Sequence, residues 1–182
     1  MFVCQQTLYE IMENKSITCC FTGHRTVAQH HRDQAEEAVL RHIRDLRKRG
    51  FTRFIAGGAL GFDTLAALCV LKAAETDHDI KLILAVPCLN QTEKWSSMPD
   101  ALAHLRTYKT IMGRADEVVY TSQRTYFDGC MKIRNQYMTD HAAVCIAYWN
   151  GSRGGTFQTV RMAEKAGLEI INVFEEMDSS EW

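Results

Sequence analysis

The clearest indication of the fold of this chain is the segment Phe54-Ile-Ala-Gly57-Gly58-Ala-Leu-Gly61-Phe-Asp63. A short apolar run ends in two adjacent glycines, and a third glycine and an acid precede an Ala/Leu-rich segment. This pattern predicts a buried strand that turns sharply into a helix. Glycines leave main-chain amides open to a ligand, and the first amides of the helix lie at the positive end of its dipole. The turn suits a phosphate, although a turn that only packs the helix onto the sheet could have the same sequence.

Apolar runs alternate with segments of helical periodicity along the whole chain. The periodicity predicts helices over residues 33–49, 60–75, 100–112, 128–141 and 157–166, and strands over 17–21, 53–56, 80–86, 117–120, 143–149 and 169–174. Several strands are continuously apolar, which indicates a mainly parallel sheet covered on both faces. A length of 182 residues predicts one domain spanning residues 1–182. We expect residues 1–15 to form a peripheral arm and residues 175–182 a frayed tail.

Composition limits the partners that we expect. A net charge of -1 provides no overall attraction to nucleic acid or to anionic membranes, so we expect no nucleic-acid partner and no membrane. No apolar run approaches the roughly 20 residues that span a bilayer, and no secretory signal is evident, so we expect a cytoplasmic protein. The seven cysteines include no Cys-x-x-Cys pair, which favours buried, reduced thiols over a metal site. The basic residues Arg41, Arg44 and Lys48 are expected to form a solvated helix face.

Three unusual loops follow predicted strands, and they span residues 22–25, 57–63 and 150–156. Ligands of parallel sheets bind beyond the carboxyl ends of the strands, where the strand order reverses. We therefore expect these loops to converge on one binding pocket. The fingerprint Gly-x-Gly-x-x-Gly is absent after the first strand, and so is the phosphate loop of P-loop enzymes, which argues against a plain NAD dehydrogenase and against such an ATPase.

Four motifs together resemble the YpsA-type branch of the SLOG superfamily over residues 17–174. They are Phe21-Thr22-Gly23-His24-Arg25, Gly57-Gly58-Ala59-Leu60-Gly61-Phe62-Asp63, Arg134-Asn135 and Gly154-Gly155-Thr156. The resemblance implies a Rossmann-like, three-layer α/β/α sandwich. It also implies that the chain binds or senses a nucleotide or a nucleotide-derived ligand, such as a nucleoside phosphate or a molecule like ADP-ribose or NAD. No other cofactor is expected.

Two related families suggest alternative functions. The first glycine turn is similar to that of DprA proteins, which bind single-stranded DNA. The last glycine turn is similar to that of LOG enzymes, which cleave the glycosidic bond of nucleoside monophosphates. In the LOG pattern, carboxylates stand where this chain has Ile133 and Thr159. Such cleavage needs carboxylates, so we expect ligand binding without that chemistry and assign no catalytic residue. A LOG-like phosphoribohydrolase and a DprA-like binder of single-stranded DNA remain the alternatives.

The resemblance also implies roles for the site residues. The amides of Gly57, Gly58 and Ala59 would bind one phosphate, and Gly154, Gly155 and Thr156 would form a second anion site. Arg134 would clamp a phosphate or serve as a structural ion-pair partner. Asp63 would contact a ribose or cap its own helix. The other expected ligand-binding residues are Thr22, Gly23, His24, Arg25, Gly61, Asn135 and Asn150.

Two further features of the sequence leave alternatives open. Trp149 follows the strand over residues 143–149, where its indole could stack on a base or pack against the protein. Trp95, close to Pro87, is a weaker candidate for stacking. A homo-oligomer is also possible, because related folds often pair through helices, but no pattern in the sequence identifies an interface.

Overall fold

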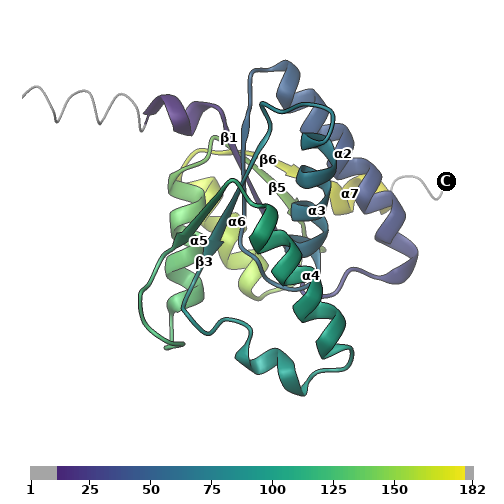
Figure 1. The fold of residues 1–182 in the computed structure, drawn as a ribbon. Helices are drawn as coiled ribbons and strands as arrows, with labels where there is room; N and C mark the ends of the chain where they lie inside the picture. The colour runs from purple at the N-terminus through teal and green to yellow at the C-terminus, as the bar shows by residue number, and fades with distance from the viewer. Residues whose placement is uncertain (1–11, 179–182) are drawn as a thin grey trace, which may run out of the picture.

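Six parallel strands form one sheet in the computed structural model, which describes residues 12–178 (Figure 1). The strand order is β4-β3-β2-β1-β5-β6, and every neighbouring pair is parallel. The predicted parallel sheet is therefore confirmed. The strands are β1 (Thr18–Gly23), β2 (Arg53–Ala56), β3 (Lys81–Val86), β4 (Glu117–Tyr120), β5 (Val144–Tyr148) and β6 (Glu169–Asn172).

Helices cover both faces of the sheet, as the predicted three-layer sandwich requires. One face packs against α2 (Arg32–Lys48), α3 (Phe62–Ala74), α4 (Ala101–Arg114) and α7 (Val173–Asp178). The other face packs against α5 (Cys130–Asp140) and α6 (Gly155–Lys165). Two short 3-10 helices, η1 (Gln29–His31) and η2 (Glu93–Ser97), lie in the connections.

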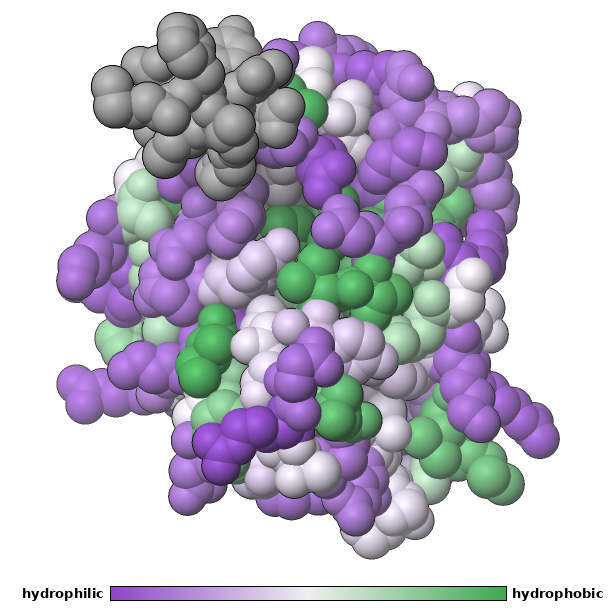
Figure 2. All heavy atoms as spheres, turned by 60° about the vertical axis from the view of Figure 1, so that its left-hand side comes forward, coloured by the Kyte–Doolittle hydropathy of each residue, from purple (hydrophilic) through white to green (hydrophobic). Residues whose placement is uncertain are grey.

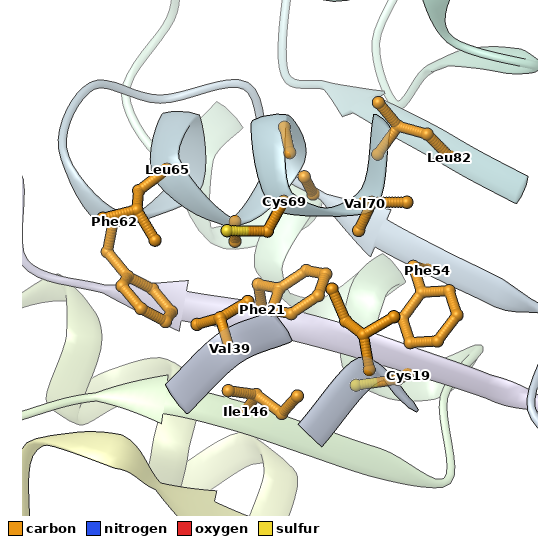
Figure 3. Packing of buried hydrophobic residues seen from close by; sticks show 14 of the residues in the cluster. Cys19, Phe21, Val39, Phe54, Phe62, Leu65, Cys69, Val70, Leu82 and Ile146 are labelled. Atoms are coloured by element: carbon orange, nitrogen blue, oxygen red, sulfur yellow. The ribbon is translucent and has the colours of Figure 1, made fainter. Parts of the chain in front are cut away.

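The larger core lies between the sheet and the layer of α2, α3, α4 and α7 (Figure 3). Phe21 of β1 and Phe54 of β2 stack with ring centroids 6.2 Å apart. Val39 of α2 and Phe62 of α3 are fully buried against them. Alternate residues of a strand face opposite sides of a sheet, so inward-facing apolar side chains are available to both helical layers.

The cysteines follow the same alternation. Cys19 belongs to the larger core, whereas its neighbour Cys20 belongs to the core under α5 and α6. All six cysteines within residues 12–178 are buried free thiols, as predicted. Burial raises the pKa of the Cys69 thiol to about 12, with a smaller contribution from Glu36. These thiols therefore serve as small apolar residues of the core.

The C-terminal segment differs from its prediction. The sequence predicted a strand that reaches residue 174 and a frayed tail from residue 175. In the structure the last strand ends at Asn172, and the helix α7 begins at Val173. Met177 is buried, and Glu176 forms an ion pair with Arg41 and a hydrogen bond with His42 of α2 at 2.7 Å. These contacts hold residues 173–178 against α2. A helix of six residues is too short for its periodicity to be recognised in the sequence, so α7 was not predicted. Residues 12–16 are helical, and the expectations for residues 1–11 and 179–182 lie outside the described residues.

The strand order reverses at one place in the sheet. The chain builds outward from β1 through β2 and β3 to β4, and then returns to β5 on the other side of β1. Parallel sheets of this kind bind ligands beyond the carboxyl ends of the two strands at such a reversal. None of the helices within residues 12–178 has the length and apolarity needed to cross a membrane.

Candidate ligand-binding site

A pocket of about 260 Å³ lies beyond the carboxyl ends of β1 and β5, where the strand order reverses. Its walls come from the loop after β1, the glycine turn before α3, residues 131–138 of α5 and the first turns of α6. The lining residues are Phe21, Thr22, Gly23, His24, Arg25, Ala59, Asp63, Met131, Arg134, Asn135, Met138, Gly155, Thr156 and Thr159. Two glycine turns that are distant in sequence thus contribute to one cavity.

The loop after β1 is fixed by hydrogen bonds from neighbouring elements. The backbone amide of His24 donates to the carbonyl of Tyr148 at 3.3 Å, and the amide of Phe62 donates to the carbonyl of His24 at 3.1 Å. The ring nitrogen Nε2 of His24 accepts a hydrogen bond from the amide of Asn150 at 3.2 Å. His24 therefore joins the two loops on either side of the strand reversal. Arg25, the next residue, is exposed and lines the pocket.

A buried ion pair forms the pocket wall on the side of the first glycine turn. Arg134 Nη1 lies 3.5 Å from Asp63 Oδ2, and each residue is only 6% exposed. Arg134 Nη1 also donates to the carbonyl of Gly57, and Nε donates to Asn135 Oδ1 at 2.7 Å. The amide of Ala59 donates to Asp63 Oδ2 at 3.4 Å. Both charged groups are thus bonded to protein atoms as well as facing the pocket.

Burial controls the protonation of this pair. Desolvation raises the pKa of Asp63, and the charge of Arg134 and the amides of Ala59 and Gly57 oppose that rise. Desolvation likewise lowers the pKa of Arg134, with Asp63 acting in the opposite direction. A buried pair of this kind seldom stabilises a fold, because the cost of desolvation offsets the attraction. Perturbed buried groups that line a pocket are therefore candidates for a functional role.

The first glycine turn is held by side chains in a way that its sequence does not reveal. We expected the amides of Gly57, Gly58 and Ala59 to face a phosphate, whereas the Ala59 amide donates to Asp63 Oδ2 and the Gly57 amide helps to lower the pKa of Asp63. A Cβ on Gly57 would overlap the Arg134 guanidinium. The buried Gln91, from the connection after β3, donates to the carbonyl of Gly58. Asp63 therefore acts as an internal anion for the turn.

Of the three glycines in this turn, none lines the pocket. Gly58 has a φ of 64° and faces Leu84 and Tyr108. Gly61 has a φ of 79°, and a Cβ there would overlap the backbone of Arg25, so this glycine allows the two loops to approach closely. These glycines shape the pocket through backbone conformation rather than through direct exposure to it.

The second glycine turn places the start of α6 at the pocket. Gly155 and Thr156 line it, whereas the expected residues Gly154 and Asn150 do not. Asn150 instead uses its Oδ1 to accept a hydrogen bond from the amide of Ser152 at 3.1 Å. The first amides of an α-helix have no partner within the helix, so this end of α6 offers hydrogen-bond donors.

Trp149 and Trp95, the two candidates for stacking on a base, both pack against the protein. The Trp149 indole donates to the carbonyl of Ser152 at 2.8 Å, and its ring lies 5.9 Å from that of Phe157. Trp95 is 8% exposed and meets Tyr108 edge to face at 5.3 Å. Neither ring lines the pocket.

Four lining residues were not assigned to the site from the sequence. They are Phe21, Met131, Met138 and Thr159. Thr159 Oγ1 accepts a hydrogen bond from Asn135 Nδ2 at 2.7 Å and donates to the carbonyl of Gly155 at 3.0 Å. The spacing of these residues could have predicted two of them, because Thr159 follows the expected site residue Thr156 by three positions and Met131 precedes Arg134 by three. Residues at this spacing share a helix face.

No cluster of three metal-ligating side chains occurs among residues 12–178. Among the described residues, Asp63 is the only carboxylate that lines the pocket, and it is paired with Arg134. The arrangement therefore offers hydrogen-bond donors on several sides and one acidic acceptor, which suits an organic anion better than a metal ion.

Known proteins with a similar fold include DprA proteins. The structure of DprA from Helicobacter pylori, described for its single-stranded DNA binding mode, has a TM-score of 0.62 and 17% identity, and the match covers 93% of this chain and 74% of that one. DprA from Streptococcus pneumoniae also has a TM-score of 0.62, with 15% identity over 88% of this chain and 50% of its own. At these identities the likeness shows the fold.

Sequence relatives identify the family. The chain is 31% identical over 134 residues to the "Uncharacterized SPbeta prophage-derived protein YoqJ" of Bacillus subtilis (strain 168), covering 68% of this chain and 75% of YoqJ. It is 25% identical over 138 residues to a UPF0398 protein of Bacillus thuringiensis (strain Al Hakam), covering 75% and 72%. The model YpsA, described as the "YspA SLOG family", matches residues 19–170. The chain therefore belongs to the YpsA family of SLOG proteins.

Proposed function

We propose that the pocket binds the phosphoribosyl part of a nucleotide or nucleotide-derived ligand. The observation that carries this proposal is the convergence of the β1 loop, the Asp63–Arg134 pair and the start of α6 on one cavity at the strand reversal. This is the position at which doubly wound parallel sheets bind nucleotides. Membership of a SLOG family agrees with a ligand of this class.

The phosphate would bind between α6 and two arginines. The amides of the first turn of α6 point toward the pocket end of the helix, where the helix dipole favours negative charge. Arg25 adds an exposed cation. Arg134 Nη2 makes no hydrogen bond within residues 12–178, so this nitrogen is available to a ligand oxygen. A planar guanidinium is well suited to such a contact.

The sugar would bind at Asp63. A carboxylate accepts hydrogen bonds from hydroxyl groups, and this is the acidic group that lines the pocket. The volume also limits the ligand. At about 260 Å³, the cavity is just below the roughly 300–1,000 Å³ of typical ligand pockets. A ribose phosphate would fill it, and the rest of a larger ligand would extend outside.

Calorimetric titration of the purified protein tests this proposal. We would use ribose 5-phosphate, AMP, ADP-ribose, NAD and inorganic phosphate as ligands. Saturable binding of the first two, lost in Arg25→Ala, is the expected result. Arg153→Ala is the matched control, because Arg153 is an exposed arginine that does not line the pocket. Absence of heat and of any melting shift with every ligand would refute the proposal.

Hydrolysis of a nucleoside monophosphate is less well supported. Ile133, which stands where a LOG enzyme has an acid, is 47% exposed and does not line the pocket. Thr159 lines the pocket but has a hydroxyl in place of the carboxylate. Asp63 would have to supply the acid. Chromatography of AMP incubated with the protein tests this activity, and release of adenine that Asp63→Asn abolishes would establish it.

Single-stranded DNA is a second candidate ligand, and the likeness to DprA argues against excluding nucleic acid. One observation on this chain favours it. Lys94 Nζ lies 3.9 Å from the ring centroid of Tyr126, and the Arg124 guanidinium lies 4.9 Å from that of Phe127. Tyr126, in the connection between β4 and α5, is 41% exposed. The face of the molecule in Figure 2 has patches of hydrophobic residues among hydrophilic ones. Aromatic rings beside cations can stack bases and bind phosphates.

A mobility-shift titration with a labelled oligonucleotide tests this candidate. Affinity that falls steeply with salt and is lost in Tyr126→Ala would support it. No shift at low salt would exclude it. The same titration with Arg25→Ala distinguishes this surface from the pocket.

A further inference from the structure

A groove larger than the pocket lies between α2 and α3. These two helices are labelled on the right-hand side of Figure 1. Its volume is about 490 Å³, and it shares no lining residue with the candidate site. Leu40, Ala73 and Ile80 provide apolar walls. The basic residues that line it are Arg44, Arg47, Lys48 and Lys72.

The charge of the residues that line the groove changes from basic to acidic along its length. A second hollow shares Leu40, Arg44 and Lys72 with it and is otherwise acidic, with Asp33, Glu36 and Glu37. The acidic end lies at the start of α2 and the basic end at its last turns. The combined surface, defined by the lining residues of both hollows, is called the α2–α3 groove below.

Part of the charge in the α2–α3 groove is already paired. Lys72 bonds to Glu36 at 2.9 Å, and Lys48 bonds to Asp45 at 2.8 Å. Among the charged residues that line the groove, Asp33, Glu37 and Arg44 form no ion pair with any of residues 12–178. They are therefore available to a partner.

The order of side chains along α2 is self-complementary. Asp33, Glu37, Leu40, Arg44 and Lys48 follow one another at intervals of three or four residues, so they share one face of the helix. Glu37 and Arg44 lie equally far from the point between positions 40 and 41, and so do Asp33 and Lys48. In an antiparallel pair of α2 helices centred there, each acid therefore meets a base of the other helix.

We propose that the α2–α3 groove binds a second copy of this chain through a two-fold axis near Leu40. Under that axis, Glu37 of each copy faces Arg44 of the other, and the two Leu40 side chains meet. Leu68 of α3, which is 39% exposed and lies one turn before Lys72, becomes buried at the rim. A self-complementary patch is the requirement for a closed, two-fold dimer.

Two alternative roles for this face are less well supported. Acids at the start and bases at the end of a helix also suit its dipole, but the dipole does not require an apolar side chain between them. A small anion would find few free charges, because Arg44 is the only basic lining residue of the groove without an ion pair among residues 12–178. A copy of the chain satisfies the acidic and the basic ends together.

Sedimentation velocity of the full chain and of charge-reversed variants tests the dimer. We expect the wild type to dimerise, with an affinity that decreases as salt is added. Glu37→Arg and Arg44→Glu should each weaken the dimer by about tenfold or more, because attraction becomes repulsion at two symmetric contacts. An equimolar mixture of the two variants should restore a dimer, since the reversed charges are then complementary.

Lys109→Glu on α4 is the matched control, because it reverses an exposed charge outside the groove. Glu37 and Arg44 have no ion-pair partner within residues 12–178, so both variants should fold and keep the circular dichroism spectrum of the wild type. The proposal is overturned if the wild type is monomeric at about 100 µM, a concentration that would reveal even weak dimers. It is also overturned if the dimer persists in Glu37→Arg, or if the mixed variants remain monomeric.

Discussion

Arg134 of α5 lies 3.5 Å from Asp63 of α3, although these helices cover opposite faces of the sheet. The two side chains meet beyond the carboxyl ends of the strands, where the sheet no longer separates them. Arg134 also bonds to the carbonyl of Gly57, so the pair fastens the first glycine turn to α5. The position of this wall of the pocket therefore depends on how α3 and α5 are placed on the two faces of the sheet.

We predict that Asp63→Asn lowers stability at pH 7, because it leaves the Arg134 guanidinium buried without its charged partner. Burial raises the pKa of Asp63, although Arg134 and two amides oppose this. A raised folded-state pKa contributes stability that is complete below the unfolded pKa, about 3.9, and is lost as the pH rises through the folded value. Asparagine stays neutral and avoids that part of the loss, so Asp63→Asn should cost less than Arg134→Met does. Urea denaturation of both variants at pH 7 measures the two costs.

Asp63→Asn should also lose the binding of ribose 5-phosphate. A variant that is folded but does not bind would separate the functional role of the carboxylate from its structural role. A cost of Asp63→Asn equal to or greater than that of Arg134→Met would contradict the raised pKa of Asp63.

Arg134→Met should destabilise the protein by about 3 kcal/mol at pH 7, because one partner of a buried pair leaves an uncompensated charge. Without Arg134, the opposing effect on the pKa of Asp63 is removed, and that pKa rises further. In the Asp63→Asn background, the same change should cost much less. A double-mutant cycle in urea measures the difference.

Lys132→Met serves as the control for Arg134→Met, because Lys132 is an exposed base on the same helix. It should change the free energy of unfolding by less than about 0.5 kcal/mol. Equal costs of Arg134→Met in the two backgrounds would contradict a coupled pair.

Gly57→Ala should destabilise the protein by about 2 kcal/mol, because its Cβ would overlap the Arg134 guanidinium in a packed site. Gly113→Ala in α4 is the matched control. It meets no atom within 4 Å, so it should stabilise the helix by about 0.5–1 kcal/mol. Thermal unfolding of both variants distinguishes a specific steric requirement from a general sensitivity of glycines.

Glu169→Gln should lower stability by less than about 1 kcal/mol at pH 7, because the pair with Arg49 is about half exposed to solvent. The hydrogen bond from Arg49 lowers the pKa of Glu169. A lowered pKa contributes stability above the unfolded value, about 4.3, and this contribution is lost as the pH falls through the folded value. Denaturation at pH 7 and pH 3 should show a difference that disappears at the lower pH.

Some features of this protein follow from short stretches of its sequence, whereas others depend on residues that are far apart in the chain. The continuous apolar run over Leu82–Val86 predicts a strand buried on both faces, and the structure buries these residues against two helical layers. The role of Gly57 was not predictable, because the guanidinium that excludes a Cβ there comes from Arg134, far along the chain. Likewise, the acceptor of the Asn150 amide is His24, which is 126 residues away.

The alternation of strands and helices and the two glycine turns after strands could be predicted from the amino-acid sequence. Periodicity and glycine conformation act over a few residues, so they can be recognised locally. The folded structure was needed to show which turn residues line the pocket, that Asp63 accepts a hydrogen bond from the Ala59 amide, and that Arg134 is its partner. These features depend on distances between segments that come together only when both helical layers pack on the sheet.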